Sequence, residues 1–149
     1  MSSIFYNIEP KVINIELACL IGLNEAIVLQ QLHYWIEKNK ATGTNYQDGH
    51  FWTYGTIQQY RDRDFRFWSF ETVKRTLAKL ISAGFVITGN YNRMKLDQTK
   101  WYAIDYFAVD ELVRKNASIS NVNRLSLNKL QHKLNQCQQV KPEQTATQT

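Results

Sequence analysis

One stretch of the sequence decides the fold, and its residues 69–86 read SFETVKRTLAKLISAGFV. Apolar side chains recur there at helical spacing, at Val73, Leu77, Leu80 and Ile81. Ser69 is a favoured N-cap residue and Gly84 a favoured helix stop. The pattern therefore predicts an amphipathic helix over residues 70–83, with its apolar stripe docked on the rest of the domain.

The face of this helix opposite the apolar stripe is polar. At about 100° per residue it holds Glu71, Thr72, Arg75, Lys79 and Ser82, with Lys74 on the flank. Taken alone, this pattern is typical of a surface helix whose charged face is solvated. The neighbouring elements are therefore needed to decide whether the face is a binding surface.

The elements predicted upstream are a short helix ending at Gly22, a helix over residues 25–38 capped by Asn24, a polar loop over residues 40–49, a strand over residues 50–53, and a short helix from Thr53 or Thr56 to about Arg61. Residues 62–68 interrupt the pattern. The elements predicted downstream are strands over residues 85–88 and 99–106, a flexible loop over residues 89–98 between them, and a closing helix over residues 109–115. Together they predict one domain over residues 1–115.

Residues 116–149 form a polar tail rich in Asn, Ser, Gln and Thr. A short apolar seam runs through it, at Leu127, Leu130, Leu134 and Cys137. The seam predicts one amphipathic helix, and the composition after Val140 is typical of disorder. A docking helix and self-association into a homodimer both remain open for the seam.

The order strand, helix, turn, helix, strand, basic loop, strand suits double-stranded DNA. The major groove admits one α-helix, a second helix holds it in place, and two strands can carry a loop to the adjacent backbone or minor groove. We expect Glu71 and Arg75 to read base edges and Lys74 and Lys79 to contact phosphates. The candidate DNA-contacting residues are Ser69, Glu71, Thr72, Lys74, Arg75 and Lys79 at the second helix, Arg93 and Lys95 in the loop, and Arg61 and Arg63 in the turn, with Arg66 beside them.

Several of these residues have a second interpretation. The arginines of the turn alternate with Asp62 and Asp64, which favours local ion pairs. The two cations of the loop would also be explained by simple solvation. Trp52, Trp68 and Trp101 could stack on bases, as in single-strand binders, but packing within the domain is favoured.

The net charge of +5 is unevenly distributed along the chain. Residues 1–52 carry three Lys or Arg against five Asp or Glu, residues 53–105 carry nine against five, and residues 106–149 carry six against three. The basic excess therefore begins where the predicted DNA-binding elements begin, which suits an anionic partner.

The same sequence argues against several other classes of protein. The two cysteines and three histidines have no metal-ligand spacing, and we expect no metal or other cofactor. No P-loop, nucleophile motif or carboxylate pair indicates an enzyme. No signal peptide and no apolar run of membrane-spanning length is found, so we expect a cytoplasmic protein without a membrane partner.

Two segments, residues 53–57 (TYGTI) and residues 69–86, resemble bacterial winged helix-turn-helix proteins. Residues 23–35 (LNEAIVLQQLHYW) and 100–106 (KWYAIDY) are similar to the N-terminal domain of phage and plasmid replication-initiation proteins, the replisome organisers. The resemblance covers residues 12–112. It implies recognition of origin DNA followed by recruitment of a helicase loader or helicase.

The fold class that we predict is α+β and mainly helical, a winged helix-turn-helix with a three-helix core, a β-hairpin wing and a C-terminal polar tail. The predicted function is sequence-specific binding of double-stranded DNA at an origin of replication. Two alternatives remain open, a transcriptional regulator of a mobile element and an adaptor in which the winged helix contacts only proteins.

Overall fold

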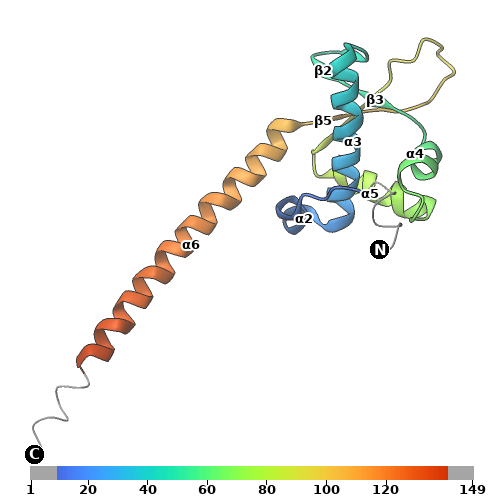
Figure 1. The fold of residues 1–149 in the computed structure, drawn as a ribbon. Coiled ribbons are helices and arrows are strands. Elements are labelled where there is room, and N and C mark those ends of the chain that lie inside the picture. Colours follow the sequence, from blue (N-terminus) through green and yellow to red (C-terminus); the bar gives the residue numbers. More distant parts are fainter. Residues whose placement is uncertain (1–9, 141–149) are drawn as a thin grey trace, which may run out of the picture. The chain divides into compact units, whose positions relative to one another are not determined.

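The structure, a computed structural model, describes residues 10–140 and the side chains of residues 10–137. The chain divides into two compact units between Asp110 and Glu111. The described helices are α2 (Ile15–Ile21), α3 (Leu23–Thr42), α4 (Ile57–Asp64), α5 (Phe70–Ser82) and α6 (Tyr106–Val140). The described strands are β1 (Tyr46–Gln47), β2 (His50–Phe51), β3 (Thr53–Tyr54), β4 (Val86–Gly89) and β5 (Trp101–Ile104). The fold class is therefore α+β and mainly helical (Figure 1).

Helix α3 is longer than the sequence predicts. Gly22, at φ 106°, ends α2 and serves as the N-cap of α3, so Asn24 lies inside the helix and the prediction that it is the cap is wrong. The helix also continues past residue 38 to Thr42, where Gly43 in the left-handed conformation ends it. The polar residues 39–42 resembled a loop because they carry no apolar stripe.

The predicted strand over residues 50–53 is two separate strands. His50–Phe51 pairs with β1 in a small hairpin, whereas Thr53–Tyr54 pairs with β5. The hairpin turn is Asp48-Gly49, with both residues at positive φ. An Asp-Gly pair is a strong hairpin signal, so this turn was readable from the sequence.

The second sheet joins the predicted hairpin to the short strand β3. Its strand order is β3-β5-β4, and both pairings are antiparallel. Val86 pairs with Ile104 at one end of the β4–β5 ladder, and Gly89 pairs with Trp101 at the other. The loop of residues 90–100, hereafter the β4–β5 loop, extends beyond the end of this sheet (yellow in Figure 1).

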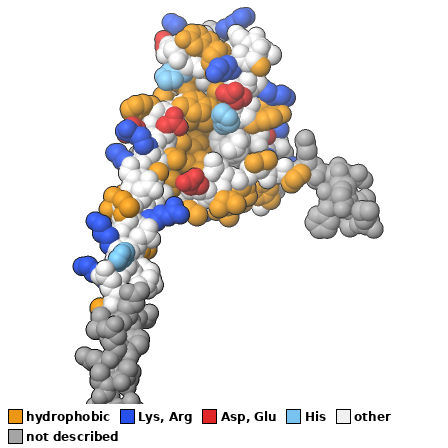
Figure 2. All heavy atoms as spheres, turned by 60° about the vertical axis from the view of Figure 1, so that its left-hand side comes forward, with side chains coloured by type: hydrophobic (Ala, Val, Ile, Leu, Met, Phe, Trp, Pro, Cys, Tyr) orange, Lys and Arg blue, Asp and Glu red, His pale blue; other side chains and the backbone are white. Residues whose placement is uncertain are grey.

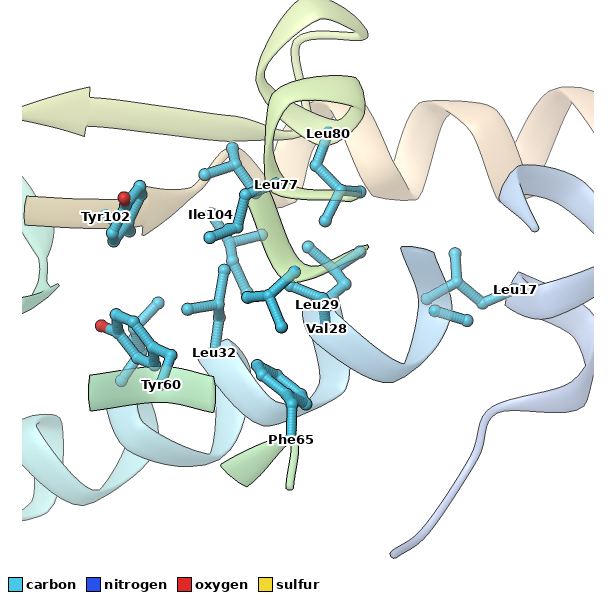
Figure 3. Close-up of a cluster of buried hydrophobic side chains, with 14 residues drawn as sticks. Leu17, Val28, Leu29, Leu32, Tyr60, Phe65, Leu77, Leu80, Tyr102 and Ile104 are labelled. Atoms are coloured by element: carbon cyan, nitrogen blue, oxygen red, sulfur yellow. The ribbon is translucent and has the colours of Figure 1, made fainter. Parts of the chain in front are cut away.

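The core lies between α3, α4, α5 and this sheet. Figure 3 shows its side chains pointing toward one another from these elements, and Leu32, Tyr60, Phe65, Leu77 and Leu80 are all nearly inaccessible to solvent. The helix predicted over residues 70–83 is present as α5, with Ser69 as its N-cap. The predicted apolar stripe of α5 is buried except at Ile81, which is half-buried. Burial of this stripe fixes which face of α5 remains outside.

Helix α4 begins as predicted and ends later. Thr56 accepts from the backbone N–H of Gln59, and the Gln59 side chain accepts from the backbone N–H of Thr56, which completes a capping box. The helix runs past Arg61 to Asp64, inside the segment predicted to interrupt the pattern. The charged residues there were mistaken for loop, although their side chains hold the helix in place as described below.

The C-terminal part of the chain differs most from the prediction. Instead of a closing helix over residues 109–115 and a separate tail, α6 is one continuous helix from Tyr106 to Val140. Its first residues belong to the first unit, where Val109 packs against the core. The sequence contains no Gly or Pro between residues 106 and 140, so nothing in it breaks the helix.

In the second unit, the predicted seam lies on one exposed face of α6. Leu127, Leu130 and Leu134 are each more than half exposed, and Cys137 is exposed with a free thiol. Both expectations for the seam, a docking helix and self-association into a homodimer, stay open. The predicted disorder after Val140 lies outside the described residues. No helix in the described part of the chain has the length and apolar character needed to cross a membrane.

Candidate nucleic-acid interface

The outward face of α5 carries a carboxylate and two cations. Glu71, Lys74 and Arg75 are exposed, and Arg75 lies on the side of the helix opposite buried Val73 and Leu77. No carboxylate among residues 10–137 lies within ion-pairing distance of Lys74 or Arg75. The guanidinium of Arg75 therefore has its donors available to a ligand from outside.

The other predicted residues of α5 are engaged within the protein. Ser69 accepts from the backbone N–H of Thr72 at 3.2 Å, and the two hydroxyl oxygens are 3.0 Å apart. The Lys79 ammonium lies 3.5 Å from a carboxylate oxygen of Glu25 on α3. Because Lys79 is 66% exposed, this pair is weak, about 0–1 kcal/mol. The polar stripe predicted around Thr72, Arg75 and Lys79 thus divides, because Arg75 faces outward, Lys79 pairs with α3 and half-buried Thr72 is bonded to the N-cap Ser69.

Arg61 stabilises the turn between α4 and α5. Its Nε donates to the backbone carbonyl of Trp68 at 3.0 Å, and its Nη1 lies 3.1 Å from Asp62. The Trp68 carbonyl immediately precedes Ser69, the cap of α5. Arg61 therefore fixes where α5 begins relative to α4. The hydrogen bond to Asp62 also helps to lower the pKa of that exposed carboxyl, after the larger effect of the Gln58 side chain.

Arg63 is held against α3 by its shape and its charge. Its guanidinium lies 4.1 Å from the ring centre of Trp35, and both Nε and Nη2 donate to Asp64 at 3.1 and 3.0 Å. The sequence-based alternative of local ion pairing thus describes the geometry of both Arg61 and Arg63. Arg66, the third arginine of the turn, is exposed and has no ion-pair partner within the described residues.

Asp64 is a buried polar junction that the sequence analysis missed. Its side chain is 4% exposed, and its two oxygens accept from Gln31 and Trp35 on α3 as well as from Arg63. Bonds to several donors offset the cost of burying a carboxylate. The donors on α3 are about thirty residues away in sequence, and no local pattern of residues points to that contact.

The base of the β4–β5 loop is held by side chains rather than by strand pairing. The Asn92 amide donates to the carbonyls of Asp97 and Thr99 at 3.0 and 2.8 Å, and its oxygen accepts from the Trp101 indole at 2.8 Å. The Tyr91 hydroxyl donates to Asp48 in the turn of the β1–β2 hairpin. The loop expected to be flexible is thus tied at several points within the first unit.

The β4–β5 loop carries more positive than negative charge. Arg93, Lys95 and Lys100 are exposed, without an ion-pair partner in the described part of the chain. The one carboxylate, Asp97, accepts from the backbone N–H of Thr99 at 2.9 Å, and this bond lowers its pKa. The loop therefore carries three cations that face solvent and one carboxylate that is hydrogen-bonded within the loop.

The tryptophans pack within the protein. Trp52 and Trp101 are buried, and half-buried Trp68 stacks on Phe65 with ring centres 5.4 Å apart. One of the aromatic rings that do face outward is Tyr54, which is 51% exposed and stacks on Trp101 at 4.9 Å. Base stacking on the tryptophans would therefore need the domain to open.

The exposed cations come as separate groups. On the face drawn in Figure 2, Lys and Arg side chains of the first unit are interspersed with Asp and Glu. The unpaired cations described above come from three places, namely Arg66 in the turn, Lys74 and Arg75 on α5, and Arg93, Lys95 and Lys100 in or beside the β4–β5 loop. In residues 10–140, no cluster of His, Cys, Asp and Glu is suited to hold a metal ion.

These side chains can bind an extended polyanion at several points, but their arrangement contains no reacting pair of groups. Comparison with protein-family models, with curated protein sequences and with solved structures finds no match for this chain.

Proposed function

We propose that the first unit is a winged helix-turn-helix that binds double-stranded DNA in a sequence-specific manner. The chain order α3, β3, α4, α5, β4, loop, β5 and the strand order β3-β5-β4 support this reading. In such a domain α4 supports α5, α5 enters the major groove, and the β4–β5 loop is the wing. The turn between α4 and α5, residues 65–69, is longer than the usual three or four residues.

The observation that carries the proposal is the outward position of Arg75. A guanidinium that faces away from the helix stripe buried in the core can reach the O6 and N7 atoms of a guanine with two hydrogen bonds. Glu71, one turn earlier on the same face, can accept from a cytosine amine. Specific recognition in this proposal therefore belongs to these two residues.

The other candidate residues supply phosphate contacts or position α5. We assign Arg66, Lys74, Arg93 and Lys95 to the DNA backbone, because each is exposed and unpaired within the described residues. Arg61 and Arg63 act as positioning residues, since both are bonded within the domain. Lys79 and Thr72 lie at the side of the outward face of α5, and we expect them to contribute less to DNA binding.

The biological role that we propose is origin recognition during replication of a phage or plasmid. The resemblance of residues 23–35 and 100–106 to replication-initiation proteins supports it. A helicase loader or helicase would then be the protein partner. A transcriptional regulator of a mobile element would use the same surface of α5, and the residues on that surface do not separate the two roles.

Footprinting on DNA from the neighbourhood of the encoding gene tests this role. An origin-binding protein protects several copies of a site at regular spacing, whereas a paired, two-fold symmetric site supports the transcriptional regulator. Absence of any protection or mobility shift, even in dilute buffer, contradicts the proposal in both forms.

The adaptor alternative makes a different prediction about α5. A protein-interaction adaptor would keep its partner and its phenotype after replacement of Arg75 and Lys79 by Ala, and it would leave duplex DNA unbound. An enzyme is not part of the proposal, and turnover of nucleotide or DNA by the purified chain would overturn it.

A further inference from the structure

The tip of the β4–β5 loop exposes two large apolar side chains next to its cations. The tip reads Arg93-Met94-Lys95-Leu96, so cationic and apolar residues alternate. Met94 is 71% exposed and Leu96 is 90% exposed, the highest value among the large hydrophobic residues of the described chain. Single exposed apolar residues are ordinary, but two at one protruding tip form a small apolar surface that is available to a partner.

The loop holds these side chains in a defined turn. The backbone N–H of Asp97 donates to the carbonyl of Met94 at 3.1 Å, which makes residues 94–97 a four-residue turn. Lys95 and Leu96 are its two central residues, and Leu96 therefore stands at the apex. The Asn92 side chain closes the base of the same loop, as described above.

We propose that this tip is an apolar wedge, in which Leu96, with Met94 beside it, inserts between base pairs from the minor groove and bends the duplex. The inference rests on the proposed DNA binding and adds an activity to it. Leucine and methionine are among the side chains that proteins insert in this way, and the insertion partly unstacks the bases and kinks the DNA.

The charge of the tip is the reason to assign it to DNA. Arg93 and Lys95 stand on either side of Met94, and Lys95 directly precedes Leu96. Both cations remain unpaired within residues 10–137, so they can neutralise phosphates beside a narrow groove. The Asp97 carboxylate, which accepts from the Thr99 N–H, remains charged, so residues 93–97 carry two cations and one anion and a net positive charge. An apolar tip alone would not select a polyanion, whereas a tip in which two cations adjoin the apolar residues favours one.

Two classes of DNA binder can be separated by this feature. A binder without a wedge can recognise its site on a duplex that stays nearly straight. A wedge lowers the cost of bending and of separating the strands, which are the steps that must follow recognition at an origin. The proposal therefore links the shape of one loop to duplex distortion rather than to affinity.

Ring closure by DNA ligase tests the wedge without knowledge of the target site. A duplex of about 120 bp is shorter than the persistence length of about 150 bp, so it closes slowly unless a protein bends it. We expect the full chain to accelerate closure. We expect the double variant Met94→Ala/Leu96→Ala to close rings about tenfold more slowly, while its affinity in a mobility-shift assay changes less than about threefold.

Two further variants serve as controls. Leu96→Met keeps a side chain able to insert and should retain most of the ring closure. Ile15→Ala removes a similarly exposed apolar side chain, 77% exposed, from α2 and should behave as the wild type. Circular dichroism of all variants should be unchanged, because none of these side chains is buried.

The outcomes distinguish this inference from the function on which it rests. A wild-type chain that shifts the duplex but does not accelerate closure, or a double variant that closes rings as fast as the wild type, overturns the wedge and leaves DNA binding intact. A wild-type chain that leaves the duplex unshifted in dilute buffer overturns the DNA-binding proposal and the wedge with it. Loss of a co-purified acidic protein on Leu96 replacement, with ring closure unchanged, would assign the tip to a protein partner instead.

Discussion

At Arg75, one guanidinium faces outward from α5 and has no carboxylate of the described residues within ion-pairing distance. We expect Arg75→Ala to weaken specific binding by about 1–3 kcal/mol and to relax the preference at one base pair, because a bidentate contact to guanine is lost. Competition between the footprinted site and its single-base variants measures this. Lys79→Ala is the matched control, with a smaller and sequence-independent effect, since Lys79 pairs with Glu25 on the flank. Equal effects of the two replacements would contradict the assignment.

Tyr60 makes the stability of the domain depend on pH in the alkaline range. Burial raises the pKa of Tyr60 to about 12, while its hydrogen bond to Thr53 acts in the opposite direction. The unfolded chain loses this proton near pH 10 and the folded chain keeps it, so the contribution to stability is complete below pH 10 and is lost as the pH rises toward 12.

The variant Tyr60→Phe isolates this contribution, because burial also raises the pKa of Tyr102 and Tyr106. Between pH 8 and pH 11 the wild type should lose about 1.4 kcal/mol more unfolding free energy than the variant. Urea unfolding at the two pH values measures the difference. Parallel losses in the two proteins would show that Tyr60 titrates alike in the folded and unfolded chains.

At the scale of the elements, Asp64 joins α4 to α3. We expect Asp64→Ala to destabilise the first unit by about 1–3 kcal/mol, because the indole N–H of half-buried Trp35 and the side-chain amide of Gln31 lose their acceptor. Asp62→Ala, two residues earlier on the exposed side of α4, should cost less than about 0.5 kcal/mol. Urea unfolding of the two variants checks this, and similar midpoints would mean that the junction does not hold the helices together.

The helices whose ends are marked in the sequence were predictable. Ser69, the apolar stripe of α5 and Gly84 all act within one segment of the chain, and α5 follows them closely. The two strands after it were also predicted, although β5 is shorter than expected. These features depend on local preferences that a single sequence displays.

Features that depend on distant partners could not be predicted in the same way. The stacking of Arg63 on Trp35 and the approach of Lys79 to Glu25 arise from packing of α4 and α5 on α3. A sequence shows that a residue is charged, but it does not show which distant side chain will neutralise it. Helix α6 was missed for another reason, since its many Asn, Ser and Gln residues resemble a tail while the absence of Gly and Pro allows a helix.

At the scale of the whole molecule, the charge of the chain is the property that the proposed DNA binding depends on. Residues 53–105, which carry the proposed DNA-binding elements, have nine Lys or Arg against five Asp or Glu. In the second unit, Glu111 is the last acidic residue before Val140, and five Lys or Arg lie between these two residues. Both units thus favour a polyanion, and salt should weaken binding by restoring counterions to the phosphates.

The most direct measurement is the affinity for one duplex over a range of salt concentrations, for the wild type and for Lys95→Ala. With four to five phosphate contacts, the logarithm of the wild-type affinity should fall linearly with the logarithm of salt, with a slope of about −4. The variant should bind all duplexes more weakly, with a slope shallower by about one. A wild-type affinity that does not change with salt, or no binding in dilute buffer, would contradict recognition of double-stranded DNA by this protein.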